Sequence, residues 1–253
     1  MPNDAAITLN APPEGLDLAT HAFFLDFDGT LVAIAPQPDA VRLAPETASL
    51  VERLYDATDG AVAIVTGRAL SGLRPHLGPL SLVIAGSHGH EIHWPGDDIP
   101  GAPDQAEELS AAHDMLRPFA ESRGLRLERK PGAVALHYRS APEHGGASRD
   151  AVDAAVDGDS ALRAIHGNMV SEVALTRSGK DVAVRELLKS APFHSKTPIM
   201  VGDDVTDEDG FRAASETGGF GLRIGTAQTT ARYQVETMDD FHRWLAKLLA
   251  GVR

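Results

Sequence analysis

The sequence predicts an α/β fold in which a doubly wound, mostly parallel sheet of the Rossmann-like type carries an inserted α+β module. Between residues 21 and 93, short apolar runs alternate with segments of helical periodicity, which is typical of stacked βαβ units. Segment 94–103 interrupts this pattern with three prolines and two glycines. The alternation returns after Ser178-Gly179, so the region between these two points is predicted to be an insertion.

The first part of the chain contains three apolar runs and two helical segments. The runs predict buried strands at 22–27, 61–65 and 82–85. A helix is expected at 45–56, because Pro45 suits a first helical position and Asp59-Gly60 suits a helix end. A shorter helix is expected at 68–77.

The inserted part has a different sequence pattern, in which segments of alternating polar and apolar residues lie between segments of helical periodicity. We expect a helix at 104–122, strands at 125–129 and 133–139 joined by Pro131-Gly132, a helix at 147–156 and a strand at 170–175. Residues 1–97 and 178–253 are therefore predicted to form the core domain, and residues 98–177 the inserted domain.

The last part resumes the pattern of the first. Helices are expected at 180–189, after Asp207 and at 238–249, with strands at 197–201 and 219–224. The apolar residues of the closing helix, Phe241, Trp244, Leu245 and Leu248, have the spacing of a core-facing stripe.

The composition excludes several classes of function. The 253 residues include 36 acidic and 23 basic side chains, and the formal net charge of −13 argues against nucleic-acid and anionic membrane partners. The chain contains no cysteine, which excludes disulfides and thiolate metal sites. The first basic residue is Arg42, and the longest apolar runs, such as 61–65, are too short to cross a bilayer, so a cytoplasmic protein is expected.

Asp26 and Asp28 directly follow the first apolar strand, with Gly29 and Thr30 behind them. Ligands of open α/β sheets bind outside the carboxyl ends of the strands, where both acids would lie. One carboxylate can then act as a nucleophile while the other exchanges a proton with the leaving and entering oxygens. The alternative is a surface turn, since Asp and Gly are common in turns.

A second acidic segment follows the apolar run 199–201 and holds five acids within positions 203–209. Clustered carboxylates suit a hard divalent cation such as Mg²⁺, with Asp203 and Asp204 as the first candidates. The alternative is a helix N-terminus, where Asp207 and its neighbours would favour the helix dipole.

Two further segments indicate weaker candidates. Thr66-Gly67-Arg68 follows a strand and opens a helix, so the hydroxyl and backbone N–H groups there could hold a phosphoryl oxygen, or form only a cap and turn. Lys180 lies at a helix start, where a cation is electrostatically misplaced unless an anion partners it. Most such lysines are merely solvated.

Together, these four segments resemble the motifs of the haloacid dehalogenase superfamily, in the same order along the chain. The resemblance implies a phosphotransferase that forms an aspartyl phosphate. Asp26 would be the nucleophile, Asp28 the general acid and base, and Thr66 and Lys180 would hold the transferring phosphoryl group. The implied Mg²⁺ site comprises Asp26, Asp28, Asp203, Asp204 and Asp207.

Further segments resemble the trehalose-6-phosphate phosphatase family: Gly-Ser-His-Gly-His-Glu at 86–91, Glu-Arg-Lys at 128–130, His-Tyr-Arg at 137–139, and Glu172. The resemblance extends over residues 23–245, and the insertion would be the family's α/β cap. Two residues depart from the family pattern, namely Asp181, where glycine is usual, and His90, where a small residue is common. The first departure leaves the placement of Lys180 open.

The resemblance also implies a phosphosugar substrate, an upstream trehalose-6-phosphate synthase and a monomer. The implied substrate-binding residues are Gly67, Arg68, His88, Glu91, Glu128, Lys130, Arg139 and Glu172. The residues alone leave simpler interpretations open, because Glu128 and Lys130 have the spacing of an exposed strand face and His88 could be a structural histidine. The alternatives for function are a sucrose-phosphate or hexose-phosphate phosphatase, an inactive sugar-phosphate binding protein and, disfavoured by length, a phospho-accepting receiver module.

Overall fold

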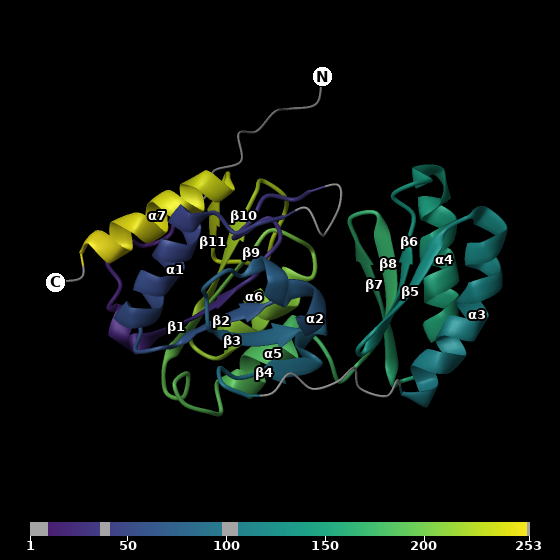
Figure 1. Ribbon diagram of the computed structural model, residues 1–253, viewed down its shortest axis with the longest axis horizontal. Helices are drawn as coiled ribbons and strands as arrows, with labels where there is room; N and C mark the ends of the chain where they lie inside the picture. The colour runs from purple at the N-terminus through teal and green to yellow at the C-terminus, as the bar shows by residue number, and fades with distance from the viewer. Residues whose placement is uncertain (1–9, 36–40, 98–105, 252–253) are drawn as a thin grey trace, which may run out of the picture.

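A central sheet of seven strands carries the first and last parts of the chain (Figure 1). The computed structural model describes residues 10–35, 41–97 and 106–251. The strands of this sheet are β1 (His21–Leu25), β2 (Val62–Val65), β3 (Val83–Gly86), β4 (Glu91–His93), β9 (Thr197–Gly202), β10 (Phe220–Ile224) and β11 (Tyr233–Val235). Their order is β11-β10-β9-β1-β2-β3-β4, and neighbours run parallel except that β4 is antiparallel to β3.

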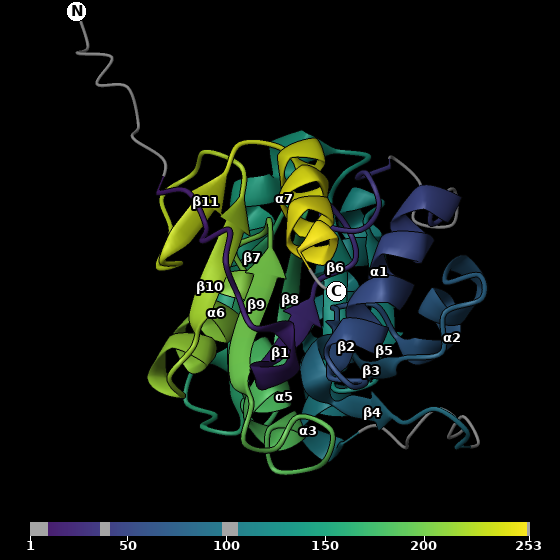
Figure 2. The same ribbon diagram turned by 90° about the vertical axis from the view of Figure 1, so that its left-hand side faces the viewer.

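Helices cover both faces of this sheet (Figure 2). They are α1 (Pro45–Ala57), α2 (Leu70–Leu73) and α7 (Met238–Ala250) on one face, and α5 (Lys180–Leu187) and α6 (Asp207–Glu216) on the other. Successive residues of a strand point to opposite faces, so Phe23 and Leu25 of β1 pack toward the first group and Phe24 toward the second. Burial on both faces explains why the central strands are continuous apolar runs.

The inserted part of the chain forms a second, antiparallel sheet of four strands. These strands are β5 (Arg126–Lys130), β6 (Ala133–His137), β7 (Leu162–Gly167) and β8 (Val170–Leu175), in the order β5-β6-β8-β7. Helices α3 (Glu107–Arg123) and α4 (Gly145–Val156) cover one face of this sheet, and Figure 1 shows the opposite face turned toward the central sheet.

The strand register decides which side chains share the face turned toward the central sheet. Glu128, Ala135, Glu172 and Ile165 lie in one row across the four strands. Lys130 lies two rows further along, opposite Ala133. The sheet therefore presents Glu128, Lys130 and Glu172 on one face, because residues two apart on a strand point the same way.

The predicted fold class is confirmed, whereas strands β4, β7 and β11 were not expected. Strands β4 and β11 have three residues each, and the edge strand β7 places Arg163 and His166 among its apolar residues, so none shows a clear apolar pattern. The helix expected at 68–77 consists of α2 followed by a 3₁₀ turn at Arg74–His76. The domain boundaries remain a prediction, since residues 98–105, including the expected helix start at Asp104, lie outside the described residues.

Within the described ranges, none of the helices combines the length and the apolar character needed to span a bilayer.

Candidate active site

The acidic and hydroxyl residues predicted from the motifs gather at the carboxyl ends of neighbouring strands. Asp26 follows β1, Thr66 follows β2 and Asp203 follows β9. Because β1 lies between β2 and β9 and runs parallel to both, these three residues meet at one edge of the sheet. Lys180, the first residue of α5, reaches the same place from one face of the sheet.

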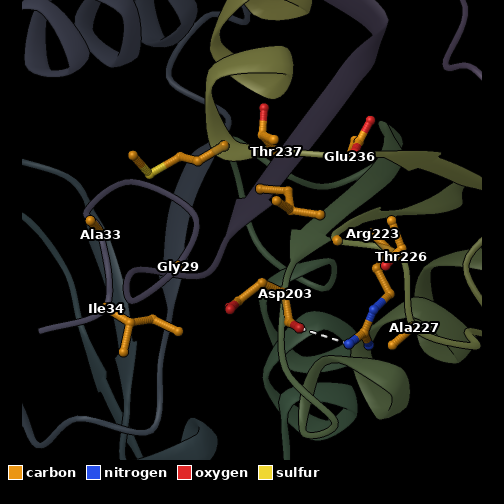
Figure 3. Close-up of a pocket in the computed structure, with 12 residues that line it drawn as sticks. Gly29, Ala33, Ile34, Asp203, Arg223, Thr226, Ala227, Glu236 and Thr237 are labelled. Carbon is orange, nitrogen blue, oxygen red and sulfur yellow. Dashed lines mark hydrogen bonds between the residues drawn. The ribbon is translucent and has the colours of Figure 1, made fainter.

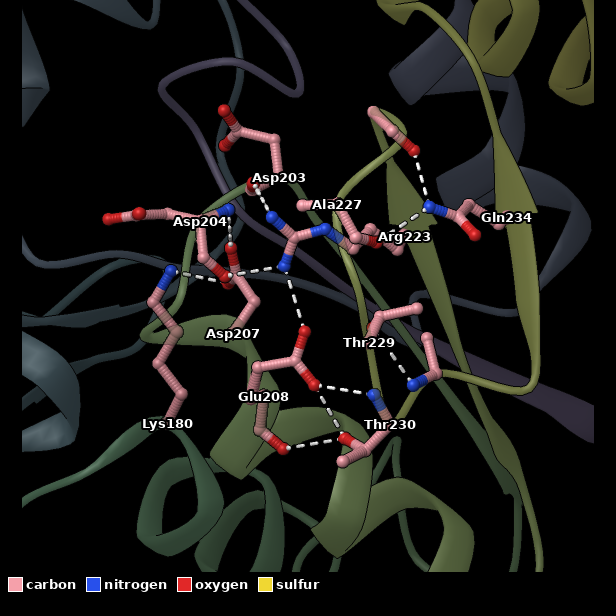
Figure 4. A network of polar contacts seen from close by, with 12 residues as sticks. Lys180, Asp203, Asp204, Asp207, Glu208, Arg223, Ala227, Thr229, Thr230 and Gln234 are labelled. Carbon is pink, nitrogen blue, oxygen red and sulfur yellow. Dashed lines mark hydrogen bonds and ion pairs between the residues drawn. The ribbon is translucent and has the colours of Figure 1, made fainter. Parts of the chain in front are cut away.

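Lys180 connects two buried carboxylates at this edge (Figure 4 shows it beside Asp207). Its Nζ donates to Oδ1 of Asp26 at 2.8 Å and to Oδ1 of Asp207 at 2.6 Å. The other oxygen of Asp207 accepts the backbone N–H of Asp204 at 2.9 Å. The departure at Asp181 has therefore not displaced Lys180 from the site. We call Asp26, Lys180, Asp203 and Asp207 the core cluster.

The core cluster holds more negative than positive charge, and its pKa values reflect this. Burial raises the pKa of Asp203 to about 7, and the nearby carboxylates of Asp207 and Asp204 add to the increase. Burial also raises the pKa of Asp26 well above its ordinary value, although Lys180 opposes this. Burial alone would lower the pKa of Lys180, but Asp207 and Asp26 raise it above the ordinary value. One lysine does not neutralise three carboxylates, so the cluster can accept a further cation.

A hard divalent cation fits the donors of the core cluster. Carboxylate oxygens of Asp26, Asp203 and Asp207 lie within 4.8 Å of one another, and oxygen ligands are those that Mg²⁺ prefers. Oδ1 of Asp203 is buried without a hydrogen-bond partner, as expected for an oxygen that coordinates a metal ion. A Cβ atom at Gly29 would lie 2.1 Å from Oδ2 of Asp203, so only glycine lets this carboxylate approach the chain after β1.

The other two predicted metal ligands have different surroundings. Arg68 donates to both oxygens of Asp28, from Nε and from a terminal nitrogen, at 2.6 Å each. The carboxylates of Asp28 and Asp204 are not part of the group formed by Asp26, Asp203 and Asp207. Thr66 is buried, and its hydroxyl oxygen accepts the backbone N–H of Arg68 at 3.2 Å.

A pocket of about 400 Å³ opens beside the core cluster (Figure 3). Its lining comes from the end of β10 and from the segments that follow β1, β9, β10 and β11, and it includes Gly29, Ile34, Asp203 and Arg223. The pocket shows that Asp203 is accessible along this side of the sheet edge.

The predicted sugar-binding residues of the second sheet form a separate group. Lys130 donates to Oε1 of Glu172 at 2.7 Å, and Nε2 of His137 lies 2.7 Å from Oε2 of Glu128. We call Glu128, Lys130, His137 and Glu172 the cap cluster. Glu172 also lies 3.4 Å from Nε2 of His88, so the cap cluster contacts the core domain through that histidine.

Each carboxylate of the cap cluster has a basic side chain in contact with it, and Oε2 of Glu172 is buried without a hydrogen bond. Burial would raise the pKa of Glu172, but the charge of Lys130 and the contact with His88 hold it well below the ordinary value. The hydrogen bond from His137 lowers the pKa of Glu128, with smaller help from Lys130. Both carboxylates are therefore ionised acceptors, which suits hydrogen bonds from hydroxyl groups.

His88, in the segment after β3, packs against Gly67, in the segment after β2. A Cβ atom at Gly67 would lie 2.6 Å from the His88 ring, so glycine is required at position 67 for this contact. Glu91 accepts a hydrogen bond from the hydroxyl of Ser87 at 2.6 Å and fixes the turn around His88. Arg139 is exposed just beyond β6.

Two residues with polar roles at these clusters were not among the predicted site residues. His137 contacts Glu128 across the strand pair, and Arg223 contacts the backbone of Asp203. The signal for Arg223 was a charged residue inside the apolar segment 220–224, because a buried arginine needs a partner.

Similarity to known proteins agrees with this geometry. The sequence model of the family described as trehalose-phosphatase matches residues 24–241. The chain is 32% identical to trehalose-6-phosphate phosphatase of Escherichia coli K12 over 246 residues, which cover 93% of this chain and 89% of that protein. It is 37% identical to a probable trehalose-phosphate phosphatase of Sinorhizobium fredii over 212 residues, covering 83% and 79% of the two chains.

A solved structure shows the same fold. The C-terminal domain of the C. albicans trehalose-6-phosphate phosphatase matches with a TM-score of 0.81 at 20% identity, covering 98% of this chain and 100% of that one. Since the family's sequence model matches most of the chain, the protein belongs to the trehalose-phosphatase family.

Proposed function

We propose that this chain hydrolyses trehalose 6-phosphate to trehalose and inorganic phosphate. The observation that carries the proposal is the contact between Lys180 and Asp26 at the carboxyl end of β1. At that end of the sheet Asp26 can act as a nucleophile and Lys180 can bind the phosphoryl group that it attacks. Membership of the trehalose-phosphatase family supports the substrate. A trehalose-6-phosphate synthase would supply that substrate, and we expect a cytoplasmic monomer.

The proposed reaction has two steps. In the first, a carboxylate oxygen of Asp26 bonds to phosphorus while the bond from phosphorus to the sugar oxygen breaks, and Asp28 gives that oxygen its proton. In the second, Asp28 takes a proton from water as the water oxygen bonds to phosphorus. The bond between phosphorus and Asp26 then breaks, which restores the carboxylate and releases phosphate.

The neighbouring side chains would position these groups. Lys180 would hold a phosphoryl oxygen together with the hydroxyl of Thr66. The two hydrogen bonds from Arg68 to Asp28 support a role in orienting the general acid and base. The contact between His88 and Glu172 supports a closed arrangement in which bulk water is kept from the site.

Asp26 and Asp203, with Asp207 beside them, would hold Mg²⁺. The excess of carboxylates in the core cluster and the unpartnered Oδ1 of Asp203 support this assignment. The cation would supply neutralisation of the charge on the transferring phosphoryl oxygens. Asp28 and Asp204 remain proposed members of the metal site.

The cap cluster would recognise the sugar. A disaccharide exposes mainly hydroxyl groups, which can donate to Glu128 and Glu172 and accept from Lys130. In the structure Lys130 bonds to Glu172 and His137 to Glu128, so a sugar would exchange its hydrogen bonds for these, while Oε2 of Glu172 has no hydrogen-bond partner and could accept a further one. A sugar that hydrogen-bonds to every one of these groups loses little binding free energy in the exchange. A sugar that leaves a charged group without a partner loses more.

Phosphate release from a panel of sugar phosphates tests the proposal. We expect the highest kcat/KM with trehalose 6-phosphate, lower values with sucrose 6-phosphate and glucose 6-phosphate, and a loss of at least about 100-fold on chelating Mg²⁺. A preference for sucrose 6-phosphate would instead favour a different sugar phosphatase. No release from any substrate at saturating Mg²⁺ would overturn the catalytic role.

A further inference from the structure

Arg223 is a buried charge inside the central sheet. It lies on β10 between Leu222 and Ile224 and is 8% exposed. A buried guanidinium is costly unless acceptors surround it, so its partners identify what it stabilises. One terminal nitrogen donates to Oε1 of Glu208 at 2.8 Å and to the backbone oxygen of Asp204 at 3.3 Å, and the other donates to the backbone oxygen of Asp203 at 2.8 Å.

A second contact fixes Glu208 from the opposite side. The backbone N–H of Thr230 and its hydroxyl donate to Oε2 of Glu208 at 2.7 and 2.6 Å. The hydrogen bonds therefore run without interruption from Thr230 through Glu208 to Arg223 and on to the two backbone oxygens, as Figure 4 shows. None of these three side chains takes part in the reaction proposed above.

The segment that these bonds restrain is the acidic one between β9 and α6. Its carboxylates repel one another, and a loop with that charge would spread unless cations held it. Lys180 holds it through Asp207, and Arg223 holds it through the backbone at Asp203 and Asp204 (Figure 4). The backbone at Asp203 decides where its carboxylate lies relative to Asp26.

We propose that Arg223, Glu208 and Thr230 form a clamp that positions Asp203 for the divalent cation. Arg223 is thus a positioning residue, which acts on the cation through the Asp203 backbone. The proposal rests on the Mg²⁺ site of the proposed function. It requires the forked geometry of arginine, because one lysine ammonium lacks the planar fork that serves Glu208 and both backbone oxygens together.

Calorimetric titration of Mg²⁺ into the substrate-free protein tests the clamp without using catalysis. Outer partners of metal ligands typically contribute 10- to 100-fold to affinity. We therefore expect Arg223→Met to raise the Kd for Mg²⁺ by about 10- to 100-fold, with Arg223→Lys and Glu208→Gln between it and the wild type. Arg243→Met is the matched control, since it removes the same charge from an exposed position on α7 and should leave the Kd within about twofold.

Folding of each variant is checked by urea unfolding before the titration. If Arg223→Met does not fold, Glu208→Gln carries the test, because it keeps the shape of the side chain and removes only its charge. An unchanged Kd in folded variants of a wild type that binds Mg²⁺ would overturn the clamp alone. Failure of the wild type to bind Mg²⁺ would overturn the proposed metal site and the clamp with it.

Discussion

The core cluster and the cap cluster both combine buried or partly buried carboxylates with one lysine, yet their carboxyl pKa values are shifted in opposite directions. In the core cluster, burial raises the pKa values of Asp26 and Asp203, and the neighbouring carboxylates, which share one lysine, add to the increase. In the cap cluster, Glu172 has a lowered pKa because Lys130 and His88 together compensate it. In the core cluster three carboxylates share one lysine, whereas each carboxylate of the cap cluster contacts a basic side chain of its own, and we call such a group balanced.

Because of this difference, the two clusters suit two different tasks with a phosphosugar, namely phosphoryl transfer and recognition of the sugar. A group short of positive charge gains most from a cation and a phosphate brought together, so it suits chemistry. A balanced group gains little from a new charge but can exchange hydrogen bonds with neutral hydroxyls, so it suits recognition. If this division holds, changes to the core cluster should affect turnover, and changes to the cap cluster should affect stability and selectivity.

The largest effect is expected for Asp26→Asn. The amide cannot attack phosphorus, so turnover of trehalose 6-phosphate should fall at least about 10⁴-fold. The free energy of unfolding should stay within about 1 kcal/mol of the wild type, because the change also removes one of three crowded charges. Phosphate release and urea unfolding measure the two quantities, with Asp56→Asn on the exposed side of α1 as the control. Turnover near the wild-type value would remove Asp26 from the mechanism.

A smaller effect on stability is expected for Glu172→Gln. The change leaves Lys130 without its charged partner, and we expect the free energy of unfolding at pH 7 to fall by about 2–3 kcal/mol. Because the pKa of Glu172 is lowered in the folded protein, its contribution is complete above the ordinary value of 4.5 and is lost as pH falls below it. The difference between variant and wild type should therefore shrink by about 1 kcal/mol between pH 7 and pH 3.5.

Urea unfolding at a series of pH values measures this difference. Glu121→Gln, at an exposed position on α3, is the control and should show no such trend. A difference that stays constant down to pH 3.5 would contradict an ionised, compensated Glu172.

The smallest of the three effects is expected for Glu128→Ala. Loss of a charged acceptor for a sugar hydroxyl should lower kcat/KM for trehalose 6-phosphate by about 10- to 100-fold. With p-nitrophenyl phosphate, which has no sugar, the change should stay below about threefold. Steady-state assays with both substrates, with Glu121→Ala as the control, separate the two outcomes. Equal losses on both substrates would place Glu128 outside sugar recognition.

The central sheet could be predicted from the sequence because strands buried on both faces are continuous apolar runs. Strand β1 and its parallel neighbours follow that rule. Strand β7 could not be predicted, since Arg163 and His166, which bond to residues outside the strand, stand where an apolar residue would mark a strand. Pattern therefore predicts the centre of each sheet better than its edge.

The candidate site was predictable where one short segment carries the chemistry. Asp26 and Asp28 follow a buried strand, and this context predicted that they lie at the carboxyl end of the sheet. Arg68 and Lys180 were predicted as site residues, but their pairing with particular carboxylates was not, because it joins residues far apart in the chain: Arg68 is 40 residues from Asp28, and Lys180 is 154 from Asp26. Arg223 and His137 were not among the predicted site residues, although Arg223 lies in an apolar segment and His137 is only nine residues from Glu128.

The place where the chain leaves the second sheet has a consequence for protein engineering. Strand β8 ends at Leu175, and α5 begins with Lys180, so only residues 176–179 separate the antiparallel sheet from the lysine that we propose holds the phosphoryl group. Replacing the inserted segment with a foreign module would leave Asp26 unchanged. It would alter the residues that precede Lys180, and therefore the position of Lys180. Designers of chimaeras should therefore keep Ser178-Gly179 from the host and vary only what precedes them.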